Sequence, residues 1–140
     1  DAMLPKQGGG EIAFYGGTFT LLPIAQQQLY LKAARVFIDA GRAAGLRIST
    51  RPDALVGSCL ALLRNEGVQT IEIGCQSFDD TVLEQAGRGH SAAQSSAAVQ
   101  RCRDAGFTVG IQLMPGLPGG DVDEALSSLR RALQLNPAFL

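Results

Sequence analysis

The sequence predicts an α/β domain in which parallel strands alternate with helices. Short apolar segments recur along the 140 residues, and each is followed by a longer segment with a helical apolar repeat. Glycine or polar residues close each expected strand, at the place where parallel β/α proteins carry their sites. Because no linker divides this regular repetition, we expect one domain or part of one, closed as a barrel or open as a doubly wound sheet.

The first half of the chain contains two expected strand and helix pairs. The first strand covers 11–15, and the helix that opens at Pro23 ends before Gly41. One face of this helix carries Leu29, Ala33, Val36, Phe37 and Ala40. The second strand covers 46–50, and the helix after it stops at Gly67. Its apolar positions are Leu55, Cys59, Leu62 and Leu63.

The second half repeats the pattern. The third strand covers 68–76, Asp79 and Ser91 are expected N-caps of the two helices that follow, and the fourth strand covers 107–114. Asp121, with Glu124 three residues later, predicts a capping box. The helix that it opens has Val122, Leu126, Leu129 and Leu133 on an expected buried stripe, and residues 138–140 begin a fifth strand.

The third strand has one polar face. Thr70, Glu72, Gly74 and Gln76 alternate with Ile71, Ile73 and Cys75, and side chains alternate between the two faces of a strand. Parallel strands covered by helices on both faces read instead as continuous apolar runs. A polar face with apolar backing indicates a lumen or cleft that holds a ligand. Cys75 then belongs to the core rather than to a site.

Composition excludes several classes. Twelve Lys and Arg against thirteen Asp and Glu give a net charge of −1, so no overall field draws this segment to a polyanion. No apolar run is long enough to span a membrane and no secretory signal begins the chain, so we expect a cytoplasmic protein without a membrane partner. Cys59, Cys75 and Cys102 form neither a CxxC pair nor a disulfide framework, and we expect all three to be reduced.

Four junctions at strand ends carry the candidate functional residues. They read GGTFT over 16–20, STRPD over 49–53, EIGCQSFDD over 72–80 and QLMPGLPG over 112–119. Each motif alone is weak; the two glycines of the first are also typical of an ordinary turn. Together and in this order they resemble the radical SAM superfamily. Order and spacing are most similar to the catalytic subunit of elongator, and the oxygen-independent coproporphyrinogen III oxidases are similar at the same places.

The resemblance implies a segment of a partial (β/α)6 TIM-like barrel, about four βα units long, that binds S-adenosylmethionine against a 4Fe-4S cluster. It places Gly16, Gly17 and Thr18 in the motif that meets the methionine amino group. It places further cofactor contacts at Ser49, Glu72, Gln76, Arg88 and Gln112. Ser49 stands where both relatives tend to carry a glutamate, and Gln112 where the porphyrinogen oxidases carry an aspartate. Glu72 has a structural alternative, as the partner of Arg51 or Arg88.

The cluster ligands are absent from these residues. A radical SAM enzyme holds its cluster with a CxxxCxxC triplet, which this sequence lacks. We therefore expect residues 1–140 to be an internal segment of one catalytic domain, without the first βα unit and its cysteines, and to be inactive alone. No metal ligand and no catalytic residue is assigned within it. His90, in a loop, is expected at the surface rather than in direct chemistry.

The intact protein is expected to be an enzyme that cleaves S-adenosylmethionine reductively to a 5′-deoxyadenosyl radical. The elongator-like interpretation adds a tRNA wobble uridine as substrate, and the alternative adds a porphyrinogen. A non-catalytic α/β regulatory or binding module is the third possibility; dinucleotide and P-loop fingerprints are absent. Removal of a first unit would also leave a bare sheet edge, through which the segment is expected to self-associate.

Overall fold

The computed structural model describes residues 8–140. Within these residues, four strands alternate with five α-helices, as the sequence predicts, and two short 3₁₀ turns, which it does not predict, follow β1 and β2. The strands are β1 (Glu11–Phe14), β2 (Gly45–Thr50), β3 (Val68–Gln76) and β4 (Thr108–Leu113). The helices are α1 (Ile24–Asp39), α2 (Gly57–Asn65), α3 (Asp80–Gln85), α4 (Ala92–Asp104) and α5 (Val122–Gln134), with 3₁₀ turns η1 (Phe19–Leu21) and η2 (Pro52–Ala54).

The sheet is parallel throughout, with the strands in the order β1-β2-β3-β4. Each neighbour in space is the next strand in sequence, which is the connectivity of a β/α barrel wall. Phe139 forms an isolated parallel bridge with Gly110 of β4, and its carbonyl accepts a hydrogen bond from Ile111 N–H at 3.2 Å. The described residues thus place a single bridge, and no full strand, where the fifth strand was predicted to begin.

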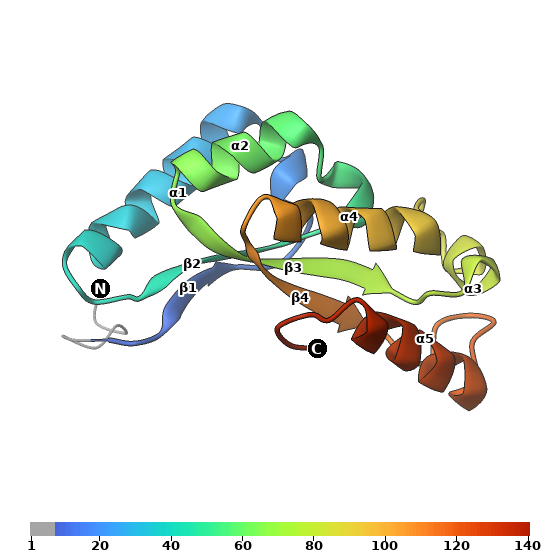
Figure 1. Cartoon of the computed structure of the whole chain (residues 1–140). Helices are drawn as coiled ribbons and strands as arrows, with labels where there is room; N and C mark the ends of the chain where they lie inside the picture. The colour runs from blue at the N-terminus through green and yellow to red at the C-terminus, as the bar shows by residue number, and fades with distance from the viewer. Residues whose placement is uncertain (1–7) are drawn as a thin grey trace.

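Helices α1, α2 and α4 cover one face of the sheet, and α5 lies beside β4 (Figure 1). The core lies between the sheet and these helices, and its fully buried strand residues are Leu46, Ile48, Ile71, Ile73 and Cys75. The strand residues that alternate with these core residues point to the other face of the sheet, which is polar. We call this polar face, with Arg47, Ser49, Thr70, Glu72, Gly74 and Gln112, the lumen face of the sheet. The predicted division of β3 into an apolar and a polar face is confirmed.

Side-chain caps fix the starts of three helices. Asp79 accepts hydrogen bonds from Thr81 and Val82 N–H, and Ser91 forms a complete capping box with Gln94. Asp121 accepts from Glu124 N–H, but the Glu124 carboxylate makes no hydrogen bond to the cap and accepts instead from Ser77 and Ser128. The box predicted at α5 is thus only half formed, because a buried hydroxyl pair competes for its carboxylate.

The stripe predicted to be buried on α5 is exposed. Val122, Leu126, Leu129 and Leu133 all face outward, with Val122 74% accessible. The helix instead buries Ser128 and Ala132, whose small side chains allow close approach to β4 and to the end of β3. Arg131 completes the docking by donating to the Phe78 carbonyl at 2.5 Å. The face predicted for α1 is also wrong: Leu29 and Val36 are exposed, whereas Gln27, Leu31 and Ala34 are buried.

No helix within residues 8–140 is long and apolar enough to cross a membrane.

Candidate functional site at the carboxyl edge of the sheet

The chain leaves β1 through a glycine turn with unobstructed space beside it. Gly16 has a φ of +101°, which only glycine adopts without strain, and it turns the chain toward η1. A Cβ atom built on Gly16 or Gly17 would meet no atom within 4 Å. Thr18 follows as the N-cap of η1, and its carbonyl accepts from Leu21 N–H at 3.0 Å. Packing inside this segment therefore does not explain the absence of a side chain at Gly17.

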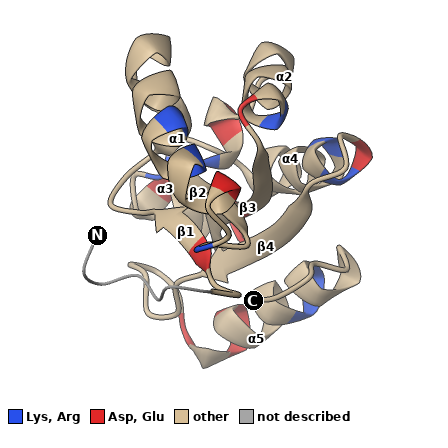
Figure 2. Cartoon of the chain, turned by 90° about the vertical axis from the view of Figure 1, so that its left-hand side faces the viewer, with Lys and Arg blue, Asp and Glu red and all other residues tan. Residues whose placement is uncertain are grey.

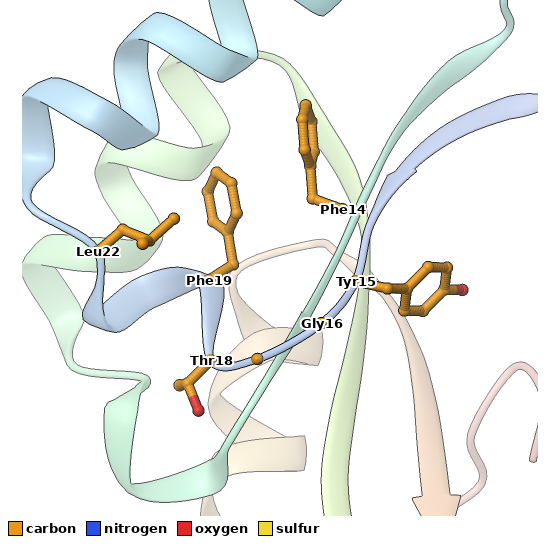
Figure 3. A pocket seen from close by; sticks show the side chains of 7 residues that line it. Phe14, Tyr15, Gly16, Thr18, Phe19 and Leu22 are labelled. Carbon is orange, nitrogen blue, oxygen red and sulfur yellow. The ribbon is translucent and has the colours of Figure 1, made fainter.

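The two sides of this turn differ in chemistry. On the helix side, a hollow of about 150 Å³ is lined by the turn itself, over 15–18, and by the apolar side chains of Phe14, Phe19 and Leu22. Figure 3 shows Tyr15 pointing away from these three side chains, toward the lumen face. The polar side chains beside this turn therefore lie on the side to which Tyr15 points, where its hydroxyl donates to Glu72.

Charged and hydroxyl side chains form a network across the lumen face. Glu72 Oε1 accepts from Tyr15 Oη at 2.6 Å and from Arg47 at 2.6 Å. Arg47 also pairs with Glu11, which accepts from Thr70 Oγ1 at 2.5 Å. Glu72 is therefore partnered by Arg47, and not by Arg51 or Arg88 as the sequence suggested. The reason is the register: Arg47 lies opposite Thr70, one step along the same face from Glu72.

This network shifts the pKa values of its members. The hydrogen bond to Glu72 and partial burial raise the pKa of Tyr15, so its hydroxyl remains a donor at neutral pH. The hydrogen bond to Glu72 also raises the pKa of Arg47. Burial alone would raise the pKa of Glu11, but the hydrogen bonds from Thr70 and Arg47 outweigh it and the pKa is lowered. One arginine thus lies between two acidic side chains, Glu11 and Glu72.

Ser49 and Gln112 lie on the lumen face near Glu72. Ser49 pairs in register with Glu72, and Gln112 pairs with Gly74. Gln112 is exposed and Ser49 is half-buried. Neither side chain makes a hydrogen bond within the described part of the chain, and Glu72 Oε2 likewise has no partner there. These groups can therefore bind a polar ligand without breaking an existing contact.

Gln76 reaches the same face by an unusual route. Its φ is +68°, and Ser77 N–H donates across it to the Cys75 carbonyl at 2.8 Å. This backbone places the Gln76 amide nitrogen 2.7 Å from the position of a Cβ on Gly74. The amide thus occupies the lumen side of Gly74, while its Oε1 is buried without a partner in the residues described.

Arg88 lies in the loop between α3 and α4 and reaches the end of β4. Its Nη2 lies 3.1 Å from Met114 Sδ, a weak acceptor, and its buried Nε has no partner among residues 8–140. His90, expected at the surface, is 7% accessible, and its Nε2 lies 3.1 Å from the Cys75 carbonyl. The prediction for the position of His90 is therefore wrong.

The expected site residues thus gather at one edge, at different depths. Glu72, Gln76, Ser49 and Gln112 share the lumen face, Arg88 reaches its rim, and the turn over 16–18 leaves β1 at the same edge. Sequence reasoning missed Tyr15 and Arg47. Both residues stand at the alternate positions that face the same side of the sheet as the polar residues of β3. This alternation was the signal that could have identified them.

The described residues fit S-adenosylmethionine but not the cluster. An open glycine turn, unpaired polar groups and a carboxylate with one free oxygen suit an amino acid joined to a nucleoside. By contrast, residues 8–140 bring no three His, Cys, Asp or Glu side chains together as a metal site requires. Burial raises the pKa of Cys75 and of Cys102 to about 12, which disfavours the thiolate that a metal binds.

Comparison with known proteins assigns the chain to one superfamily. The family model described as the radical SAM superfamily matches residues 1–132. The heme chaperone HemW of Haemophilus influenzae is 31% identical over 126 residues, which are 89% of this chain and 33% of that protein. The tRNA uridine(34) acetyltransferase of Methanocaldococcus jannaschii is 29% identical over 146 residues, with 92% of this chain and 27% of that protein covered.

A solved structure agrees with these relatives. Coproporphyrinogen III oxidase (HemN) from Escherichia coli, described as a radical SAM enzyme, superposes with a TM-score of 0.75 at 27% identity, over 91% of this chain and 30% of that chain. The chain therefore spans about a third of the length of the proteins it matches.

Proposed function

Because this chain belongs to the radical SAM superfamily, we propose that its lumen face holds S-adenosylmethionine in a larger catalytic domain. The observation that carries the proposal is the open turn at Gly16 and Gly17, beside which a Cβ would meet no protein atom within 4 Å. Unpaired polar groups of Ser49, Glu72 and Gln112 lie on the same face. A ligand would supply the missing partners.

Each residue has a proposed role in holding the cofactor. The backbone of Gly16, Gly17 and Thr18 approaches the methionine amino group, since no side chain blocks it. Glu72 Oε2 accepts a hydrogen bond from a ligand hydroxyl, the Ser49 hydroxyl donates or accepts one, and Arg47 holds the Glu72 carboxylate in place. Gln76, Gln112 and Arg88 supply further polar contacts at the rim.

When bound to a reduced cluster, S-adenosylmethionine would supply a radical that abstracts a hydrogen atom. This step depends on the cofactor and the cluster rather than on a side chain of this chain. The residues of this chain would bind and orient S-adenosylmethionine and would exclude water from around it. The described residues offer no cluster ligands, so we assign them no part in electron transfer.

We propose an elongator-like substrate, a tRNA uridine, for the whole protein. STRPD and MPGLPG support this, and one relative is named for acetyl transfer to tRNA uridine(34). Figure 2 shows segments of both signs of charge on α4 and on α5. Arg101, Arg103 and Arg131 are engaged with backbone carbonyls. The positive surface that an RNA requires must then come from other parts of the protein.

The second candidate is a porphyrin substrate or ligand. It is favoured by the likeness to coproporphyrinogen III oxidase and to a heme chaperone, at identities close to that of the tRNA enzyme. A tetracarboxylate would be bound by arginines that project into the lumen, but Arg47 is already paired with two carboxylates. This pairing is the reason to prefer the first candidate.

Two measurements on the intact protein test the proposal. Under anaerobic reduction, S-adenosylmethionine should yield 5′-deoxyadenosine, detected by mass spectrometry. A cluster-loaded protein that forms no product would favour a non-catalytic module. Affinity for tRNA is then measured at low and at physiological salt, with coproporphyrinogen as competitor. Salt-sensitive tRNA binding that the porphyrinogen does not displace supports the first candidate, and saturable porphyrinogen binding without tRNA affinity supports the second.

A further inference from the structure

Gln76 has a strained backbone. Its φ of +68° lies in the left-handed region, which a non-glycine residue seldom adopts. The hydrogen bond from Ser77 N–H to the Cys75 carbonyl, at 2.8 Å, closes a three-residue turn with Gln76 at its centre, the geometry of a rare γ-turn. Such conformations persist only where surrounding contacts hold them, and they gather at ligand-binding sites.

The turn determines where the Gln76 amide lies. It interrupts the register with β4, so that Gly74 pairs with Gln112 but Gln76 pairs with Leu113. The side chain folds back over Gly74, and its Nε2 stands 2.7 Å from where a Cβ of Gly74 would be. An ordinary extended residue would point its side chain farther along the strand. The position of this amide on the lumen face therefore depends on the turn.

Three contacts hold the turn. Met114 N–H donates to the Gln76 carbonyl at 2.8 Å, and Ser77 Oγ donates to Glu124 Oε1 at 2.6 Å. The third is His90, whose Nε2 lies 3.1 Å from the Cys75 carbonyl in a buried position. Because a carbonyl oxygen only accepts, this contact is a hydrogen bond when Nε2 carries the proton. Among the described side chains, only that of His90 binds the same carbonyl that closes the turn.

The other ring nitrogen of His90 contacts the second expected rim residue. Nδ1 lies 3.3 Å from the Arg88 carbonyl, and Arg88 reaches Met114 at the end of β4. When the proton is on Nε2, Nδ1 makes no hydrogen bond with the Arg88 carbonyl, so the ring hydrogen-bonds the strand that carries Gln76 and packs against the loop that carries Arg88. Its two nitrogens both face backbone carbonyls, so neither is available to a ligand.

We propose that His90 is a positioning residue that holds the γ-turn at Gln76 and keeps Gln76 and Arg88 in fixed relation at the rim of the lumen. It acts through these two residues and does not touch the ligand. The inference rests on the proposed function only for the identity of that ligand.

The first test measures S-adenosylmethionine affinity in the intact, unreduced protein by equilibrium dialysis. His90→Leu removes the donor and retains an apolar side chain, whereas His90→Gln keeps an amide N–H near the place of Nε2. We expect His90→Leu to weaken binding about tenfold, the order expected for one hydrogen bond, and His90→Gln to restore it to within about threefold. In a Gln76→Gly background, His90→Leu should weaken binding clearly less than in the parent, because only the part that acts through Arg88 remains. An equal loss in both backgrounds would overturn the proposal.

The second test does not involve the ligand. Glycine adopts a positive φ without strain, so the turn needs less support in the Gln76→Gly variant. His90→Leu should therefore lower the Tm in both backgrounds, and more in the parent. We expect the fall in Tm in the parent to be at least about 1.5 times the fall in the Gln76→Gly background. The same loss in both would mean that His90 only fills space. If the parent binds no S-adenosylmethionine, the proposed function fails, and this second comparison still decides whether His90 holds the turn.

Discussion

Gly17→Val should separate cofactor binding from folding. Gly17 has no positive φ, is exposed, and would place its Cβ more than 4 Å from any atom beyond its two chain neighbours. The substitution should then change the free energy of unfolding by no more than about 0.5 kcal/mol, as surface substitutions do. The branched side chain would instead occupy the space assigned to the methionine group of the ligand. A clash of this kind costs about 1–3 kcal/mol, or roughly tenfold to hundredfold in affinity.

Two matched variants make the comparison sharp. Gly10→Val introduces the same side chain into equally open space at the opposite, amino end of β1, and it should leave both stability and affinity unchanged. Gly16→Val forces a branched residue to a φ of +101° and should lower stability by about 1–3 kcal/mol.

The assay is S-adenosylmethionine binding to the intact protein, with thermal unfolding and cluster content measured on the same samples. Gly17→Val should lose affinity and, after reduction, cleavage, with its Tm and cluster content unchanged. Wild-type affinity and cleavage in Gly17→Val would refute the assignment of the glycine turn.

Three further predictions concern the network, the thiols and the sheet edge. The lowered pKa of Glu11 stabilises the fold above its ordinary value of 4.5, and this contribution is lost as pH falls through the folded pKa; Thr70→Val should raise that pKa in an NMR titration. With pKa values of about 12, Cys75 and Cys102 should resist thiol reagents at pH 8 until the chain is unfolded, and rapid labelling of the native chain would contradict their burial. The 140-residue chain should self-associate through the open edge of β1. Leu129→Glu changes α5, which packs beside β4 at the other end of the strand order, and it should leave sedimentation unchanged. A parent chain that stays strictly monomeric would count against association through the edge of β1.

The strands and the lumen face could be predicted because each depends on local pattern. Alternation along β3 separates Glu72 from Ile73 without knowledge of the partners, and β3 begins and ends where predicted. Caps at Asp79 and Ser91 are similarly local, since each involves only the next turn of its helix.

Contacts that join distant elements could not be predicted in this way. The ion pair of Arg47 with Glu72 depends on the register between β2 and β3. The apolar stripe of α5 shows that the helix is amphipathic, but not that its small residues, Ser128 and Ala132, would dock on the sheet. The turn at Gln76 contains no glycine at its positive-φ position, so the local sequence does not indicate it. One of the contacts that hold it comes from His90, which lies beyond α3 in the chain.

The most direct test of the central claim locates the cofactor on the intact protein. Hydrogen exchange with mass spectrometry is measured with and without saturating S-adenosylmethionine. We predict slower exchange in peptides that cover 14–19, 72–78 and 112–119, which lie at the carboxyl edge of the sheet, and no change over 8–11 or 104–108 at the opposite edge. Protection confined to the amino edge, or none at any of these peptides under saturation, would contradict the account.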